Sequence, residues 1–206
     1  MKINEIFYSL QGEGADIGLP TIFIRLTGCN LRCKYCDTEY AFYEGKEMGL
    51  EQIMEEIGKW RCKRVCITGG EPLLQNVHQL IDALIKRRYE VSVETNGSLS
   101  IDNLISKKIV VKMDIKCPSS GMNDKMRMEN INLLRATDEL KFIIENREDY
   151  EYAKSVIEKY KPVCKIIMQP VWGKAKKLAD WILDDEINVR FSIQLHKILW
   201  KGKRGK

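Results

Sequence analysis

The chain has 206 residues, of which 44% are hydrophobic and 31% are charged, and its formal net charge is +5. These values are typical of a soluble globular protein, and the sequence has no run of about 18 apolar residues that would predict a transmembrane helix. The first residues, Met1–Glu5, lack the charged region followed by an apolar run that marks a secretory signal. We therefore expect a cytoplasmic protein with no membrane partner.

Strand-like apolar segments alternate with amphipathic helical segments along the chain. We expect strands at Thr21–Leu26, Arg64–Thr68, Glu90–Glu94, Ile109–Ile115, Glu139–Ile144, Val163–Met168 and Val189–Leu195. We expect helices at Leu50–Trp60, Leu73–Arg87, Arg147–Tyr160 and Ala175–Asp184. This alternation predicts parallel strands joined by crossovers, but a complete eight-unit barrel needs about 250 residues. The prediction is an α/β fold, an open, partial parallel β/α barrel, formed by a single domain over residues 1–206.

Much of the positive charge lies in the last residues, Lys197–Lys206. A basic tail can contact nucleic acid, but chain ends are more often solvated and poorly ordered. We favour the solvated end and expect no nucleic-acid partner. The positive charge would also suit a small acidic substrate.

Three of the seven cysteines, Cys29, Cys33 and Cys36, follow the first predicted strand with the spacing C-x3-C-x2-C. Ligands of parallel α/β sheets bind at the carboxyl ends of the strands, and clustered thiolates suit zinc or iron–sulfur. Structural zinc sites and ordinary 4Fe–4S proteins both use four protein ligands. Three cysteines would leave one iron open for substrate or cofactor. The other four are expected to be buried thiols, namely Cys62, Cys66, Cys117 and Cys164.

Polar groups also follow the later predicted strands. Gly69-Gly70-Glu71-Pro72 allows close backbone approach to a ligand, although a simple strand-to-helix turn would have the same composition. Glu94-Thr95-Asn96-Gly97 suits either a ribose or carboxylate contact or an Asn-Gly turn. Further polar ends are Asp114–Gly121, Gln169-Pro170 and Gln194–Lys197.

Arg25 lies inside the first predicted strand, among apolar residues. A buried charge needs a partner. That partner could be an internal carboxylate, or a substrate carboxylate held by the forked guanidinium. The residues alone leave both possibilities open.

Several motifs occur in order along nearly the whole chain, from about Ile6 to about Lys197. They are S-L-Q-G-E-G at Ser9–Gly14, R-L-x-G-C-N-L-x-C-x-Y-C-D-T at Arg25–Thr38, T-G-G-E-P at Thr68–Pro72, E-T-N-G at Glu94–Gly97, C-P-S-S-G at Cys117–Gly121 and Q-x-H-K at Gln194–Lys197. The C-x3-C-x2-C loop with its aromatic residue, together with G-G-E-P, resembles the radical S-adenosylmethionine (SAM) superfamily. The complete set closely resembles the 7-carboxy-7-deazaguanine synthase family.

The resemblance implies a ring contraction of 6-carboxy-5,6,7,8-tetrahydropterin to 7-carboxy-7-deazaguanine with release of ammonia, a step toward queuosine or archaeosine. It implies a 4Fe–4S cluster on Cys29, Cys33 and Cys36, SAM, and Mg²⁺ on the hydroxyl of Thr38, an oxygen ligand suited to that ion. The implied substrate contacts are Leu10, Gln11, Gly12, Glu13, Arg25 and Thr68. The implied SAM contacts are Gly70, Glu71, Thr95, Asn96, Asp114, Ile115, Lys116 and Gln169. A flavodoxin or ferredoxin as electron donor and a homodimer are also implied.

Two other functions are kept as alternatives. A glycyl-radical-enzyme activase shares the cysteine spacing and G-G-E-P but would need a peptide groove, whereas Gln11, Glu13, Arg25 and Thr38 favour a small acidic heterocycle. A non-enzymatic metal-binding module could contact RNA through the basic tail.

Overall fold

One sheet of nine strands organises the computed structural model, which describes residues 1–206. Its order is β3-β1-β2-β4-β5-β6-β7-β8-β9. The strands are β1 Lys2–Leu10, β2 Pro20–Leu26, β3 Lys46–Glu47, β4 Arg64–Gly69, β5 Glu90–Thr95, β6 Val110–Ile115, β7 Glu139–Ile144, β8 Lys165–Pro170 and β9 Arg190–Phe191. All neighbours from β2 to β9 are parallel, while β1 pairs antiparallel with both β2 and β3. The open, mostly parallel β/α architecture is therefore as predicted.

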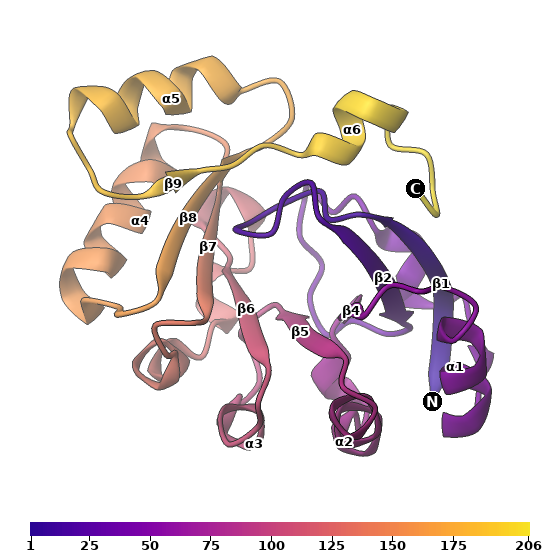
Figure 1. Cartoon of the computed structure of the whole chain (residues 1–206). Helices are drawn as coiled ribbons and strands as arrows, with labels where there is room; N and C mark the ends of the chain where they lie inside the picture. Colours follow the sequence, from indigo (N-terminus) through magenta and orange to yellow (C-terminus); the bar gives the residue numbers. More distant parts are fainter.

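Helices cover the outer side of the curved sheet (Figure 1). They are α1 Leu50–Ile57, α2 His78–Lys86, α3 Asp102–Ile105, α4 Arg147–Tyr160 and α5 Ala175–Asp184, while α6 Leu195–Trp200 lies above the mouth of the sheet. The apolar face of each longer helix packs on the sheet, as with Leu80, Ile81 and Leu84 of α2. None of the helices combines the length and apolar character needed to cross a membrane.

The N-terminal segment forms a strand that the sequence did not reveal. Residues 2–10 make up β1, whose partner β2 follows after a nine-residue connection. Most side chains of β1 are half-buried on both faces. The strand therefore lacks the apolar–polar alternation on which strand prediction depends.

The predicted helix Leu73–Arg87 is wrong in its first turn. Pro72–Leu74 is a short 3-10 turn, and α2 begins only at His78. The side chain of Gln75 accepts a hydrogen bond from Lys2 N at 2.9 Å and donates to Thr27 O at 2.9 Å. These contacts bind the segment to the neighbouring chain and interrupt the helix, which leaves Leu74 exposed instead of in the core.

The predicted strand Val189–Leu195 is also mostly wrong. Only Arg190–Phe191 pair with β8, and Leu195 is the first residue of α6. Leu195 N donates to Gly12 O at 2.9 Å, so the chain turns from the sheet edge toward the loop between β1 and β2. This long-range contact explains why the strand ends early.

Candidate active site

A cavity of about 400 Å³ opens at the carboxyl ends of the strands. Its walls come from β1 and β2, the loop after β2, the ends of β4, β5 and β6, the inner faces of β7 and β8, and the C-terminal segment. Sixteen of the eighteen predicted site residues line it: Leu10, Gln11, Gly12, Glu13, Arg25, Cys29, Cys33, Cys36, Thr38, Thr68, Gly70, Thr95, Asn96, Asp114, Lys116 and Gln169. The other two, Glu71 and Ile115, are fully buried behind the wall.

The loop after β2 packs directly on the two glycines that end β4. Because β2 and β4 are parallel with Leu26 beside Gly69, the next residues of both chains also meet. Gly70 N donates to Leu26 O at 3.2 Å and Glu71 N donates to Gly28 O at 2.7 Å. A Cβ at Gly70 would lie 2.6 Å from the Gly28 carbonyl carbon and 2.8 Å from Cys29 Cβ. Glycine is required here by close backbone approach.

Arg32 closes the same loop on itself. Its Nη1 donates to the carbonyls of Cys29 at 2.8 Å and Leu31 at 2.7 Å, and its guanidinium lies 4.2 Å from the centre of the Phe42 ring. Lys34 N donates to Ser120 O at 3.1 Å, which ties the loop to the segment after β6. The loop is therefore anchored at two separate points.

Cys29, Cys33 and Cys36 all border the cavity as free thiols. Burial raises the pKa of Cys33 and Cys36, an effect that the nearby Lys116 opposes at Cys33. No three Cys, His, Asp or Glu side chains converge on a single metal-ion position. No fourth cysteine lies on the cavity wall. Three soft thiolates on one loop fit a 4Fe–4S cluster that keeps one iron without a protein ligand.

The carboxylate of Glu71 joins the turn after β4 to the turn after β5. It accepts hydrogen bonds from Leu73 N at 2.9 Å, Thr95 Oγ1 at 2.9 Å and Asn96 N at 2.6 Å. Burial raises the pKa of this carboxyl group. Glu71 thus orients Thr95 and Asn96, which do line the cavity, and does not face it itself.

The structure confirms the Asn-Gly turn of E-T-N-G and places the turn on the cavity wall. Gly97 has a φ of 72°, as a left-handed turn residue. Asn96 lines the cavity, and its side-chain amide donates to Asn30 Oδ1 at 3.1 Å. The turn therefore serves both as a chain reversal and as part of the cavity wall.

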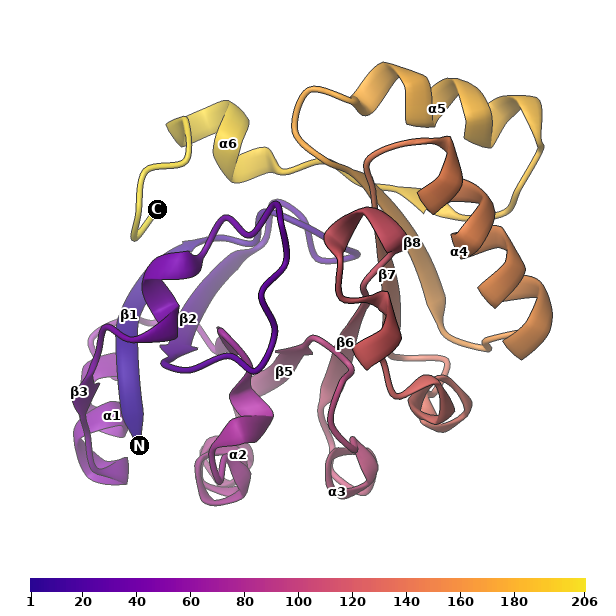
Figure 2. The ribbon, with the colours of Figure 1, turned by 180° about the vertical axis from the view of Figure 1, so that it is seen from behind.

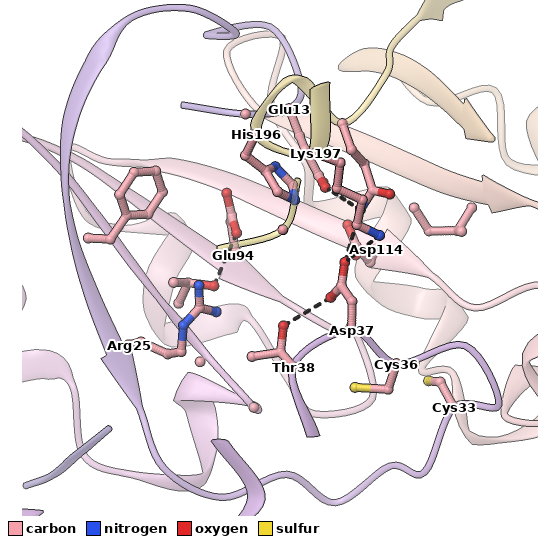
Figure 3. Close-up of a pocket in the computed structure, with 18 of the residues that line it drawn as sticks. Glu13, Arg25, Cys33, Cys36, Asp37, Thr38, Glu94, Asp114, His196 and Lys197 are labelled. Carbon is pink, nitrogen blue, oxygen red and sulfur yellow. Dashed lines mark hydrogen bonds and ion pairs between the residues drawn. The ribbon is translucent and has the colours of Figure 1, made fainter. Parts of the chain in front are cut away.

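Arg25 has an internal carboxylate partner and also borders the cavity. Its Nε donates to Glu5 Oε1 at 2.8 Å, while the side chain lines the cavity. This is the side chain's one hydrogen bond within the protein, so the terminal guanidinium nitrogens stay free for a ligand. Figure 3 shows this guanidinium on the same side of the cavity as Glu94. An arginine held by Nε presents its remaining fork to a carboxylate.

Glu94, at the end of β5, is a cavity residue that we did not predict. It accepts hydrogen bonds from Gln11 Nε2 and Thr68 Oγ1, both at 3.1 Å. The rule that ligands bind at strand ends identified its motif but not this side chain. Its carboxylate lies beside Thr68 and offers acceptors for N–H groups of a ligand.

A chain of charged groups crosses the opposite side of the cavity. Lys141 Nζ lies 2.7 Å from Glu13 Oε2 and 3.2 Å from Asp114 Oδ1, and Lys116 Nζ lies 3.2 Å from Asp114 Oδ2. Burial alone would raise the pKa of Glu13, but Lys141 and a hydrogen bond from Gln194 lower it to about 2. Lys141 was not predicted either, because it lies in the middle of the apolar run of β7.

Thr38 lies next to a second charged group. Its Oγ1 donates to Asp37 Oδ1 at 2.9 Å, and Asp37 Oδ2 lies 3.2 Å from Lys197 Nζ (Figure 3). Gln194 Nε2 donates to both Glu13 and Asp37, each at 3.0 Å. The Q-x-H-K motif therefore reaches the cavity from the C-terminal side, where His196 also lies on the wall.

The basic tail is mostly exposed, as expected of a solvated end, but it packs against the protein instead of being poorly ordered. Residues 202–206 line the cavity, and the tail returns toward β1 (Figure 2). Arg204 lies 2.8 Å from Glu44 and 3.4 Å from Glu5, and its guanidinium is 4.1 Å from the centre of the Tyr40 ring. The acidic groups on and near β1 explain this placement.

Comparison with known proteins agrees with this geometry. The model of the Radical SAM superfamily matches residues 23–169, which places the chain in that superfamily. Among individual proteins, the 7-carboxy-7-deazaguanine synthase of Methanospirillum hungatei is 44% identical over 97% of this chain and 85% of its own length. Those of Thermoplasma acidophilum and Koribacter versatilis are each 38% identical over 97% of both chains. The chain belongs to the 7-carboxy-7-deazaguanine synthase family.

A solved structure supports the same relationship. The crystal structure of QueE from Escherichia coli superposes with a TM-score of 0.81 and 25% identity, covering 95% of this chain and 94% of that one. These relatives favour the synthase family over the two alternatives, a glycyl-radical-enzyme activase and an RNA-contacting metal-binding module.

Proposed function

We propose that the chain converts 6-carboxy-5,6,7,8-tetrahydropterin to 7-carboxy-7-deazaguanine with release of ammonia, in the biosynthesis of queuosine or archaeosine. The observation that carries the proposal is the presence of three loop thiols, the Gly69-Gly70 turn and Arg25 on one cavity. With one sheet continuous from β3 to β9, residues 1–206 act as a single radical SAM domain.

The cofactors supply the radical chemistry and the chain supplies binding and orientation. When bound, a 4Fe–4S cluster with SAM would supply the radical chemistry that the substrate needs. Cys29, Cys33 and Cys36 would hold the cluster. The SAM contacts are assigned to Gly70, Thr95, Asn96, Asp114, Lys116 and Gln169.

Gln169 is supported as a ligand contact by an unsatisfied buried atom. Its side chain is 2% exposed, and its Oε1 has no hydrogen-bond partner. Buried acceptors are almost always paired. Since Gln169 lines the cavity, a donor on bound SAM is the partner that we propose for this oxygen.

Arg25 binds the substrate carboxylate, because its free guanidinium fork faces the cavity. Glu94, Thr68 and Gln11 form a hydrogen-bonded group near Arg25, and their acceptors suit the N–H edge of a pterin. The loop Leu10–Glu13 also lines the cavity. The substrate is thereby fixed by charge at Arg25 and by hydrogen bonds to the neighbouring group of Glu94, Thr68 and Gln11.

We assign Mg²⁺ to Thr38, whose hydroxyl oxygen is the kind of hard ligand that this ion prefers. The test compares Thr38→Ala with Thr38→Ser as Mg²⁺ is varied. Thr38→Ala should lose most of the stimulation by Mg²⁺, while Thr38→Ser should keep it. An unchanged metal response in Thr38→Ala would remove this residue from the site.

The decisive test of the proposed function is anaerobic incubation of the reconstituted protein with SAM, reductant, Mg²⁺ and 6-carboxytetrahydropterin. Mass spectrometry should detect the deazaguanine product and ammonia should be released. A protein with a full 4Fe–4S complement that cleaves SAM but forms no deazaguanine would overturn the assignment.

The cellular setting is a further part of the proposal. All seven cysteines are free, which suits a reducing compartment, so we propose a cytoplasmic location. Flavodoxin or ferredoxin would supply the electron, and the protein would act as a homodimer. Gel filtration with light scattering tests the dimer.

A further inference from the structure

Two lysines on neighbouring strands, Lys112 and Lys141, are both buried beside carboxylates, but they differ in whether they line the cavity. Asp114 of β6 lies beside Lys141 of β7, and two residues earlier Lys112 of β6 lies beside Glu139 of β7. Both lysines are deeply buried, with side-chain exposures of 7% for Lys112 and 12% for Lys141. Only Lys141 and Asp114 line the cavity.

Lys112 stabilises the loop that connects β1 to β2. Its Nζ lies 2.8 Å from Asp16 and 3.7 Å from Glu139. Glu139 in turn accepts a hydrogen bond from Ala15 N at 3.2 Å. This group is not part of the cavity wall, and it holds Ala15 and Asp16 of the loop through contacts that do not include Lys141.

Lys141 instead contacts one carboxylate from each ligand-facing wall. Glu13 belongs to the loop Leu10–Glu13 at the proposed substrate end, and Asp114 begins the segment assigned to SAM. No other cation contacts both of them: the second partner of Glu13 is the neutral Gln194, and that of Asp114 is Lys116. Figure 3 shows Glu13, Asp114 and Asp37 together on this side of the cavity.

We propose that Lys141 is a positioning residue that couples substrate binding to SAM binding by holding Glu13 and Asp114 with one ammonium group. The inference rests on the proposed function, because it needs SAM and pterin in one cavity. With the lysine present, either ligand that orders its own wall also orders the other. Without it, Asp114 would keep Lys116 and Glu13 would keep Gln194, but no cation would join the two carboxylates, and the walls would move independently.

The experiment measures the affinity for the pterin with and without SAM, anaerobically and without reductant, so that no turnover occurs. Coupling free energies between sites typically correspond to factors of about 5 to 150, and we expect SAM to tighten pterin binding within that range in the unsubstituted protein. In Lys141→Met, which keeps the volume and removes the charge, the factor should fall to about 1. Lys141→Arg should restore most of the coupling.

Lys112→Met is the matched control, because it removes a similarly buried lysine from the same strand pair. It should lower the melting temperature and keep the coupling factor. With reductant added, Lys141→Met should release several-fold more free 5′-deoxyadenosine per deazaguanine formed, because the substrate is no longer held when SAM is cleaved. Lys112→Met should not.

Three outcomes overturn the inference: no effect of SAM on pterin affinity in the unsubstituted protein, full coupling retained in Lys141→Met, or equal loss in Lys112→Met. If Lys141→Met does not fold, Lys141→Gln gives the same comparison at a polar side chain. Failure of the proposed function would look different, since the unsubstituted protein would then bind no pterin and form no deazaguanine.

Discussion

The two sides of the cavity are built in different ways. On the side of β2, β4 and β5, the chain is held by close backbone contacts, where Gly70 lies against Gly28 and Cys29 and the buried Glu71 binds backbone and hydroxyl groups. On the side of β6, β7 and α6, the wall is held by ion pairs between side chains, with Lys141 as their centre.

This difference explains why one side of the cavity has short sequence motifs and the other has fewer. A backbone packed this closely tolerates few residue types, so it leaves short, recognisable motifs. An ion pair requires only opposite charges at two positions, and Glu13 and Lys141 are 128 residues apart in sequence. Motifs therefore reveal the backbone of the first side, whereas on the second side they reveal Glu13 and Asp114 but not Lys141, which pairs with both.

The largest expected effect is at the cluster ligands. Replacing Cys29, Cys33 or Cys36 by Ala should abolish SAM cleavage, measured as 5′-deoxyadenosine formed with reductant, because each thiolate holds one iron of the cluster. The matched control is Cys62→Ala, whose thiol lies near Pro20 at the other end of the sheet. Undiminished cleavage in any of the three variants would contradict the cluster assignment.

A large effect is also expected from Gly70→Ala. The added Cβ would overlap Gly28 and Cys29, so the loop that carries the thiols must move. Activity should fall by at least about 100-fold, because small misplacement of reacting groups has effects of that size, and stability by about 1–3 kcal/mol. Gly49→Ala is the control, since its Cβ would meet only Gln52 Oε1 at 3.7 Å. Equal activities in the two variants would show that this side does not depend on close packing.

The fold could be predicted from the sequence where local pattern decides it. β7, α4 and α5 have the predicted bounds, since their apolar periodicity agrees with the packing they make. β1 and the start of α6 could not be predicted, because contacts to distant residues determine them. At the site, the spacing of the cysteines predicted the loop thiols. Lys141 could not be predicted, because charged residues at alternating positions of its strand are the only feature that marks it.

A smaller effect, on stability more than on chemistry, is expected from Glu71→Gln. The amide keeps one acceptor oxygen, so its NH₂ group must face either Asn96 N, which donates to Oε2, or the pair Leu73 N and Thr95 Oγ1, which donate to Oε1. An unmade buried hydrogen bond costs about 1–3 kcal/mol, which urea unfolding will measure. Glu51→Gln, on the exposed face of α1, should leave the free energy of unfolding unchanged. An unchanged free energy of unfolding in Glu71→Gln would mean that the two turns do not need this carboxylate to stay together.

The smallest effect is expected from the tail, where charge acts at the surface. Arg204 is 45% exposed, and exposed ion pairs contribute about 0–1 kcal/mol. Since Glu5 still holds Arg25 when Arg204 is removed, Arg204→Ala should leave the melting temperature and kcat unchanged. The KM for the pterin should rise about two- to five-fold, as for binding energy shared by ground and transition states, and Arg204→Lys should restore it. A fall in kcat instead would mean that the tail orients the substrate for reaction. The wall formed by the C-terminal segment would then depend on exact placement, as the cysteine side does.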